Sequence, residues 1–170
     1  MKILVLGASG MLGHKMFQTL RQRFPETYGT IRGSLTDETI RNVDLFQHGH
    51  IIEGMDAGDF TAVESFLRLR QPQVLINCVG IVKQRDAAHD AIPSITINAL
   101  LPHQLAKICR EWNGRIIHIS TDCVFSGKHG GGYGYTEQDP TDAEDLYGKS
   151  KQLGEVADEN ALTLRTSIIG

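Results

Sequence analysis

The chain has 170 residues, of which 41% are hydrophobic, and its 17 basic and 20 acidic side chains give a formal net charge of −3. This length and apolar content are typical of one folded domain with a single core. The charges form no block of one sign, so we expect no nucleic-acid partner. The chain has no apolar run of the roughly 18–20 residues that a membrane span needs, so we expect no membrane contact.

The cysteines and histidines do not form a metal site by their spacing. Cys78, Cys109 and Cys123 are an odd number without a CxxC pair, which is typical of a reducing compartment and of buried apolar thiols. The seven histidines lack ligand spacing with carboxylates or cysteines. The sequence therefore predicts a cytoplasmic protein without a metal.

Apolar stretches of strand length alternate along the chain with segments of helix length. We expect strands at Lys2–Leu6, Glu26–Ile31, Ile51–Met55, Val74–Asn77, Arg115–Ser120 and Ala161–Arg165. We expect helices at Met11–Arg23, Phe60–Arg70, Ser94–Trp112 and Leu146–Asn160. Stretches such as Ile3–Leu6 and Ile116–Ile119 are almost entirely apolar, which indicates burial on both faces by helices. The pattern predicts a three-layer α/β/α domain with a doubly wound parallel sheet, a Rossmann fold, over residues 1–170.

Two segments interrupt this regular pattern. Pro102 lies inside the expected helix Ser94–Trp112, where it removes a backbone hydrogen bond and should kink or loosen the helix. The stretch from Ser126 to Glu144 carries several glycines and a proline with little apolar periodicity, so we expect a mobile surface loop there.

Three glycines follow the first expected strand directly: Gly7, Gly10 and Gly13, with the spacing GxxGxxG, lead into the first expected helix. Glycine permits a tight turn and close backbone approach, and the free amides and positive end of the helix dipole bind a pyrophosphate. The strand–turn–helix context makes the motif specific, and the alternative is a purely structural turn. The motif predicts a dinucleotide site.

The end of the second strand bears on the choice of cofactor. A carboxylate there would bind the adenosine ribose hydroxyls, whereas a basic residue would accommodate a 2′-phosphate. The residue found is Arg32, with no carboxylate beside it. This favours NADP(H), with NAD(H) as the alternative, and an exposed loop arginine without a cofactor role is the other interpretation.

A tyrosine and a lysine stand four residues apart near the end of the chain, Tyr147 and Lys151, so that a helix would place both on one face. A neighbouring ammonium should favour the phenolate and bring the phenol closer to its working range. Such a pair can protonate a carbonyl oxygen as hydride reaches its carbon. Thr121, at the end of the fifth strand, offers a hydroxyl to the same oxygen. Alone, the pair could equally be a surface tyrosine and lysine.

With these motifs the chain resembles the extended short-chain dehydrogenase/reductase superfamily, and within it the dTDP-4-dehydrorhamnose reductase group. The glycine turn matches the superfamily's cofactor turn, Ser120–Gly127 resembles the reductases' S-T-D-Y-V-F segment, and Tyr147–Lys151 resembles their Y-G-x-x-K. Asp56 matches an acidic position that touches adenine, and Asn77–Gly80 matches a segment beside the cofactor ribose. Asn98 matches a structural asparagine.

The resemblance implies a role for each matching residue. The implied catalytic residues are Thr121, Tyr147 and Lys151. The implied cofactor residues are Gly7, Ser9, Gly10, Met11, Leu12, Gly13, Arg32, Asp56, Cys78, Val79, Gly80, Tyr147 and Lys151. The implied substrate residues are Thr121, Asp122 and Cys123.

Two departures from the family pattern concern the substrate. Cys123 replaces the tyrosine of the reductases' segment, and the glycine-rich stretch Gly127–Gly134 differs too, so the sugar or nucleotide can differ from the dTDP-rhamnose intermediates. Length is a further difference. The family continues well beyond position 170 with much of the nucleotide-sugar site. We therefore interpret the chain as the NAD(P)-binding part of a longer protein, without most of the C-terminal substrate part.

The resemblance implies an NAD(P)H-dependent reductase of a nucleotide-linked 4-keto sugar, with that small molecule as its partner and a homodimer left open. Two alternatives remain: a sugar-nucleotide epimerase of the same superfamily, and a non-catalytic NAD(P)-binding regulatory subunit. A dehydratase is disfavoured, because Cys123 stands where those enzymes carry a glutamate.

Overall fold

The computed structural model describes residues 1–82, 90–128 and 134–167. These residues contain one sheet of six strands in the order β3-β2-β1-β4-β5-β6, and every neighbouring pair is parallel. The strands are β1 (Ile3–Leu6), β2 (Thr27–Thr30), β3 (Ile51–Ile52), β4 (Val74–Asn77), β5 (Arg115–Thr121) and β6 (Ala161–Thr166). This order confirms the predicted doubly wound Rossmann fold.

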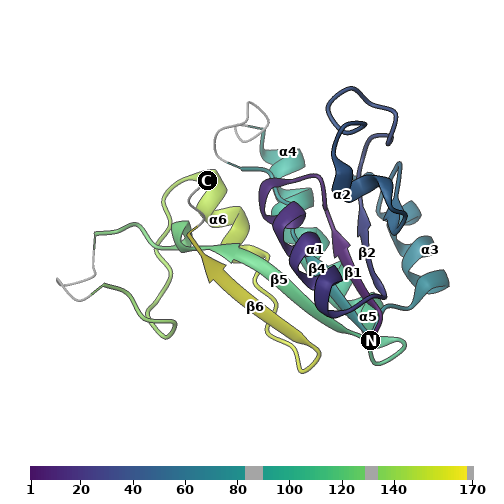
Figure 1. The fold of residues 1–170 in the computed structure, drawn as a ribbon. Coiled ribbons are helices and arrows are strands. Elements are labelled where there is room, and N and C mark those ends of the chain that lie inside the picture. Colours follow the sequence, from purple (N-terminus) through teal and green to yellow (C-terminus); the bar gives the residue numbers. More distant parts are fainter. Residues whose placement is uncertain (83–89, 129–133, 168–170) are drawn as a thin grey trace.

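Helices cover both faces of the sheet (Figure 1). They are α1 (Met11–Arg23), α2 (Asp44–Gln47), α3 (Phe60–Arg70), α4 (Ala91–Ser94), α5 (Leu101–Arg110) and α6 (Leu146–Leu153). A π-helical turn, Ile95–Leu100, joins α4 to α5, and a 3₁₀ turn, Asp122–Val124, follows β5. No helix within the described residues is long and apolar enough to cross a membrane.

The core consists of two clusters, one on each face of the sheet. Successive residues of a strand point to opposite faces, so Ile3 and Val5 of β1 pack with Phe17 of α1, whereas Leu4 and Leu6 pack toward α3 and α5. All four β1 residues are buried. This is the physical reason for the uninterrupted apolar strands in the sequence.

Several predicted element boundaries differ from the observed ones. The strand expected at Ile51–Met55 ends at Ile52, because the backbone turns at Gly54, whose φ is +70°. The helix expected at Leu146–Asn160 ends at Leu153, because the chain turns back at Gly154. A Cβ atom at Gly154 would overlap the carbonyl of Asn98, so only glycine allows this approach.

The prediction that Pro102 disturbs its helix is confirmed. The expected helix Ser94–Trp112 begins earlier, at Ala91, and changes into a π-helical turn before Pro102. Pro102 has no N–H, so it cannot donate to the Asn98 carbonyl. The N–H of the preceding residue, Leu101, donates to the Thr96 carbonyl, one residue further back than in an α-helix. This places the carbonyl of Asn98 against Gly154.

Candidate active site

The predicted cofactor turn lies at the carboxyl end of β1, at the centre of the sheet edge. Gly7 has a φ of +88°, and its N–H donates to Thr30 Oγ1 at 3.1 Å. A Cβ atom at Gly13 would overlap the Gly7 carbonyl oxygen, so helix α1 can approach the turn only with glycine there. Gly7 and Gly13 therefore have structural reasons to be glycine.

Gly10 has a different role in the same turn. It is the N-cap of α1, makes no side-chain cap, and is exposed together with Ser9 and Met11. A Cβ atom there would meet nothing closer than the Gly7 carbonyl oxygen at 3.4 Å. The first amides of α1, including those of Met11 and Leu12, have no intrahelical acceptor and face the space above Gly10. The turn thus fits the pyrophosphate of a dinucleotide, as a helix N-terminus without a side-chain cap does.

The remaining predicted cofactor residues follow β2, β3 and β4 at the same sheet edge. Arg32 is exposed after β2 and makes no ion pair within the described part of the chain. Asp56 is exposed before α3 and accepts a hydrogen bond from the Gly58 N–H at 2.9 Å. The segment after β4 lies against the glycine turn, since a Cβ on Gly7 would lie 2.8 Å from Val79 Cγ2.

Gly80 brings this edge to the predicted catalytic lysine. A Cβ atom on Gly80 would lie 3.3 Å from Asn98 Oδ1 and 3.8 Å from Lys151 Nζ. Asn98 is buried and ties the Gly80 segment to α6: its amide nitrogen donates to the Ile81 carbonyl at 3.0 Å and to Ser150 Oγ at 3.2 Å. The structural role implied for Asn98 fits these contacts.

Helix α6 carries Tyr147 and Lys151, and its first turn is capped by Asp145, which accepts from the Gly148 N–H at 2.7 Å. The half-buried Tyr147 is hydrogen-bonded to Thr121, the last residue of β5. Lys151 is buried, and its Nζ donates to the Ile119 carbonyl at 2.6 Å. The structure thus brings all three predicted catalytic side chains to one place.

The expected effect of Lys151 on Tyr147 is wrong for this structure. Burial raises the pKa of the Tyr147 phenol, and its hydrogen bond with Thr121 opposes the rise only in part. The Lys151 ammonium is directed to the Ile119 carbonyl, and burial lowers its own pKa to about 8. The phenol is protonated at neutral pH, as an unshifted phenol also is, and the raised pKa makes it a weaker acid than free tyrosine.

The predicted substrate residues form the 3₁₀ turn after β5. Asp122 and Cys123 are exposed, while Thr121 Oγ1 caps the turn by accepting from the Cys123 N–H at 3.2 Å. Thr121 Oγ1 also lies 3.3 Å from Asp122 Oδ1. The turn therefore presents an exposed carboxylate and an exposed thiol near Tyr147.

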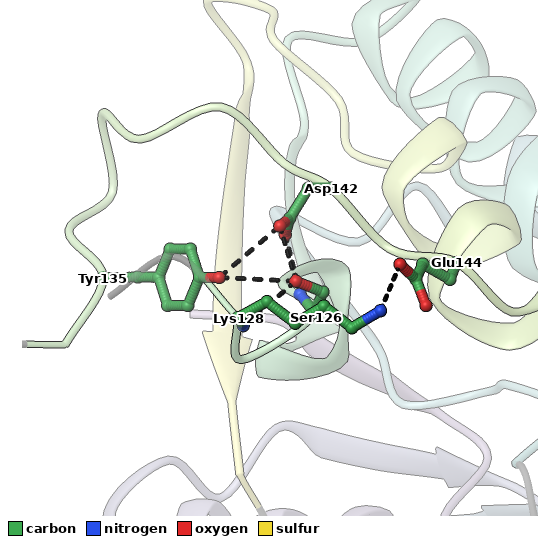
Figure 2. Close-up of polar contacts among 5 residues, drawn as sticks. All are labelled: Ser126, Lys128, Tyr135, Asp142 and Glu144. Atoms are coloured by element: carbon green, nitrogen blue, oxygen red, sulfur yellow. Dashed lines mark hydrogen bonds and ion pairs between the residues drawn. The ribbon is translucent and has the colours of Figure 1, made fainter. Parts of the chain in front are cut away.

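Figure 2 shows polar contacts in the segment between β5 and α6. The Asp142 carboxylate accepts from both the backbone N–H and the hydroxyl of Ser126, and the Tyr135 hydroxyl lies 3.5 Å from the same carboxylate. Lys128 pairs with Glu144 at 2.6 Å. The predicted loop has no helix or strand in its described residues, but these contacts join the part of the loop before residue 129 to the part after residue 133. The expectation of a mobile loop at residues 129–133 falls outside the described residues.

Sequence reasoning missed four residues that shape the site. Thr30 holds the Gly7 amide, and Ser120 and Glu155 form a hydrogen bond behind Lys151 at 2.9 Å. His118 is buried beside Asn77, whose amide nitrogen lies 3.1 Å from its Nδ1, and its Nε2 has no partner within the described residues. Only the position of Thr30 and Ser120 at strand ends could have indicated them. No group of three metal-ligating side chains occurs among the described residues.

The sheet order and the glycine turn define a Rossmann domain of the short-chain dehydrogenase/reductase type, with Thr121, Tyr147 and Lys151 together at one sheet edge. A family model described as the RmlD substrate binding domain matches residues 1–169, so the chain belongs to this family.

Individual relatives agree with this assignment. The chain is 31% identical over 154 residues to a dTDP-4-dehydrorhamnose reductase of Streptomyces griseus, covering 91% of this chain and 43% of the relative. A crystal structure of a hypothetical dTDP-4-dehydrorhamnose reductase from Sulfolobus tokodaii superposes with a TM-score of 0.80 at 28% identity, covering 97% of this chain and 55% of the other. A Bacillus anthracis dTDP-4-dehydrorhamnose reductase in complex with NADP has the same fold, with a TM-score of 0.68 at 23% identity, over 91% of this chain and 48% of its own. The chain thus spans about half the length of these relatives.

Proposed function

We propose that this chain is the cofactor-binding part of an NAD(P)H-dependent reductase that acts on a nucleotide-linked 4-keto sugar. The observation that carries the proposal is the meeting of Thr121, Tyr147 and Lys151 at the sheet edge that also holds the glycine turn. The relatives named as dTDP-4-dehydrorhamnose reductases support the substrate class. Because the relatives are about twice as long, we infer that sugar binding needs further sequence.

The residues divide the work of ketone reduction. The nicotinamide, when bound, supplies the hydride to the carbonyl carbon. Tyr147, which is protonated at neutral pH, donates its proton to the carbonyl oxygen. The Thr121 hydroxyl orients the same oxygen, and Lys151 would hold the ribose of the bound nicotinamide. Asp122 and Cys123, both exposed, are placed to contact the substrate.

The first test is cofactor binding by the chain itself. Titration with NADPH and with NADH, followed by the fluorescence of the reduced nicotinamide, should show saturable binding of at least one of them. Absence of binding to the folded chain would contradict the dinucleotide site.

The second test concerns the proton donor in the complete protein that contains this chain. Tyr147→Phe keeps the ring and removes the hydroxyl, so turnover of a 4-keto sugar nucleotide should fall by roughly 10²–10⁴ while cofactor affinity changes little. Steady-state NADPH oxidation measures this. If the variant turns over like the parent, Tyr147 is not the proton donor and the Tyr–Lys mechanism is wrong.

A further inference from the structure

Glu155 lies two residues beyond the end of α6, and its carboxylate connects three parts of the sheet edge. Its Oε1 accepts from Ser120 Oγ at 2.9 Å and from Arg165 Nε at 2.8 Å, and its Oε2 accepts from Arg165 Nη2 at 2.7 Å. The side chains of Arg165 and Glu155 are only 24% and 16% exposed. This two-pronged, shielded pair is stronger and better ordered than a surface ion pair.

The partners of Glu155 lie directly beside the catalytic cluster. Ser120 stands between Ile119, whose carbonyl holds Lys151, and Thr121, which bonds Tyr147. Arg165 of β6 is the register partner of Ser120. Glu155 therefore links the end of β5, which carries Thr121, to the chain that leaves α6, which carries Tyr147 and Lys151.

Arg165 is itself fixed from a second side. Its guanidinium lies 5.0 Å from the centre of the Phe125 ring, and Nη1 is 3.4 Å from the Glu137 carbonyl. The pair is thus held by the segment after β5 as well as by β6. A carboxylate anchored in this way keeps a defined position toward α6.

The charge of Glu155 also acts on Lys151. Burial lowers the pKa of Lys151 to about 8, and the groups that oppose this fall are Glu155 first and the Cys78 thiol of the segment after β4 second. Lys151 also faces His118 of β5, and burial together with the Lys151 charge holds the pKa of that imidazole at about 3, so His118 is neutral. Glu155 is therefore the principal carboxylate that favours the charged form of Lys151.

We propose that Glu155, held by Ser120 and Arg165, is a positioning residue that keeps the Lys151 ammonium charged and fixes α6 against the end of β5. The inference rests on the proposed function, because its consequence for turnover passes through Lys151. Glu155 touches neither substrate nor cofactor in this account.

The direct test is the titration of Lys151 in the chain by ¹³C NMR of its Cε, with the signal assigned by Lys151→Arg. In Glu155→Gln the amide oxygen can still accept a hydrogen bond from Ser120, but the charge is lost. We expect the pKa of Lys151 to fall by about one unit, since the surrounding protein and solvent screen the attraction between the Glu155 carboxylate and the Lys151 ammonium. Mere loosening of the site would expose Lys151 to water and raise its pKa, so the direction separates the two effects.

A second ion pair, at the protein surface, provides a matched control for Glu155→Gln. Glu111 forms an ion pair with Arg68 at the surface, and Glu111→Gln should leave the Lys151 titration unchanged. If Glu155→Gln does not fold, Glu155→Gln/Arg165→Met removes both charges without leaving one alone, and a fall in the pKa of Lys151 is again expected. An unchanged or raised pKa in a folded variant overturns the proposal.

Turnover of the complete protein supplies the second measurement. The upper limb of the kcat profile against pH should move to lower pH in Glu155→Gln by the same shift as the Lys151 titration. If the complete parent protein shows no NADPH-dependent turnover of a 4-keto sugar nucleotide while Lys151 still shifts in Glu155→Gln, the proposed function fails and the electrostatic role stands. If Tyr147→Phe is impaired but neither the titration nor the pH profile moves in Glu155→Gln, the role of Glu155 fails alone.

Discussion

At the scale of single residues, Lys151 is a charged side chain that the fold has withdrawn from water, and it is 4% exposed. Its hydrogen bond to the Ile119 carbonyl does not replace full hydration, so burial lowers its pKa to about 8 from an ordinary value of 10.5. The domain therefore holds a proton on this amine at a cost in stability, as is common at functional sites.

Replacing Lys151 by methionine should reveal that cost. The unfolded chain binds the proton more tightly than the folded one between pH 8 and 10.5, so the stability of the parent rises with pH in this window. Lys151→Met should be more stable at pH 7, and its advantage should shrink by about 2 kcal/mol between pH 7 and 9.5. Urea unfolding at both pH values measures this. Lys149→Met replaces an exposed lysine of the same helix and keeps Lys151, so its stability should follow the pH dependence of the parent.

Arg32 is the residue on which the choice of cofactor depends. Its side chain is exposed after β2, where a 2′-phosphate would lie in a Rossmann site. Arg32→Ala should weaken NADPH binding by about 1–3 kcal/mol, the value of a charged hydrogen bond, and spare NADH. Parallel titrations with the two cofactors decide this. Equal losses for both would remove the phosphate role from Arg32.

At the scale of elements, the turn between β1 and α1 contains residues that are glycine for different physical reasons. Gly13 is required by the fold, because a side chain would collide with the Gly7 carbonyl. Gly10 is exposed, has a φ of −75° that any residue can adopt, and has room for a Cβ on the protein side. The absence of a side chain at Gly10 therefore matters for an approaching ligand rather than for folding.

These two glycines make a matched pair of variants. Gly10→Val should fold with nearly the parent's melting temperature but lose affinity for both NADPH and NADH, because its branched side chain occupies the pyrophosphate position. Gly13→Val should instead unfold the domain or lower its melting temperature sharply. Thermal unfolding and cofactor titration of both variants check this. A folded Gly10→Val that binds cofactor like the parent would place the site elsewhere.

At the scale of the whole molecule, the sheet buries polar groups near the site that respond to pH. His118 lies fully buried in β5, where burial and the nearby Lys151 charge hold its pKa at about 3. In the unfolded chain its pKa returns to about 6.5, the ordinary value for histidine. Stability that depends on a neutral His118 is present above pH 6.5 and is lost as the pH falls toward 3.

The global unfolding free energy should therefore decrease by about 2–3 kcal/mol from pH 7 to pH 4.5 through His118 alone. His118→Gln should be less stable than the parent at pH 7, since it disturbs the core. It should lose less unfolding free energy on acidification, so the plots of unfolding free energy against pH for the two proteins should converge. His48→Gln is the control, because His48 is exposed. Parallel curves for the parent and His118→Gln would contradict the buried neutral imidazole.

The sequence by itself determined the α/β class, the parallel sheet, the glycine turn and the catalytic motif, because these depend on local periodicity and short spacings. Helix α1 and α3 agree with their predicted bounds, and Tyr147 and Lys151 do share a helix. Such elements can be predicted because the neighbouring residues that form the sequence pattern are also the residues that form the helix.

Only the tertiary structure decided where α6 ends and what surrounds Lys151. Residue 154, the C-cap of α6, must be glycine because the Asn98 carbonyl, which Pro102 leaves without its helical donor, packs against it from a segment more than fifty residues away in the sequence. The direction of the Tyr147 pKa and the link from Glu155 to Ser120 and Arg165 likewise depend on burial and on contacts between distant strands. Such contacts leave no periodic signal along the chain, because burial and electrostatic fields are set by how the elements pack.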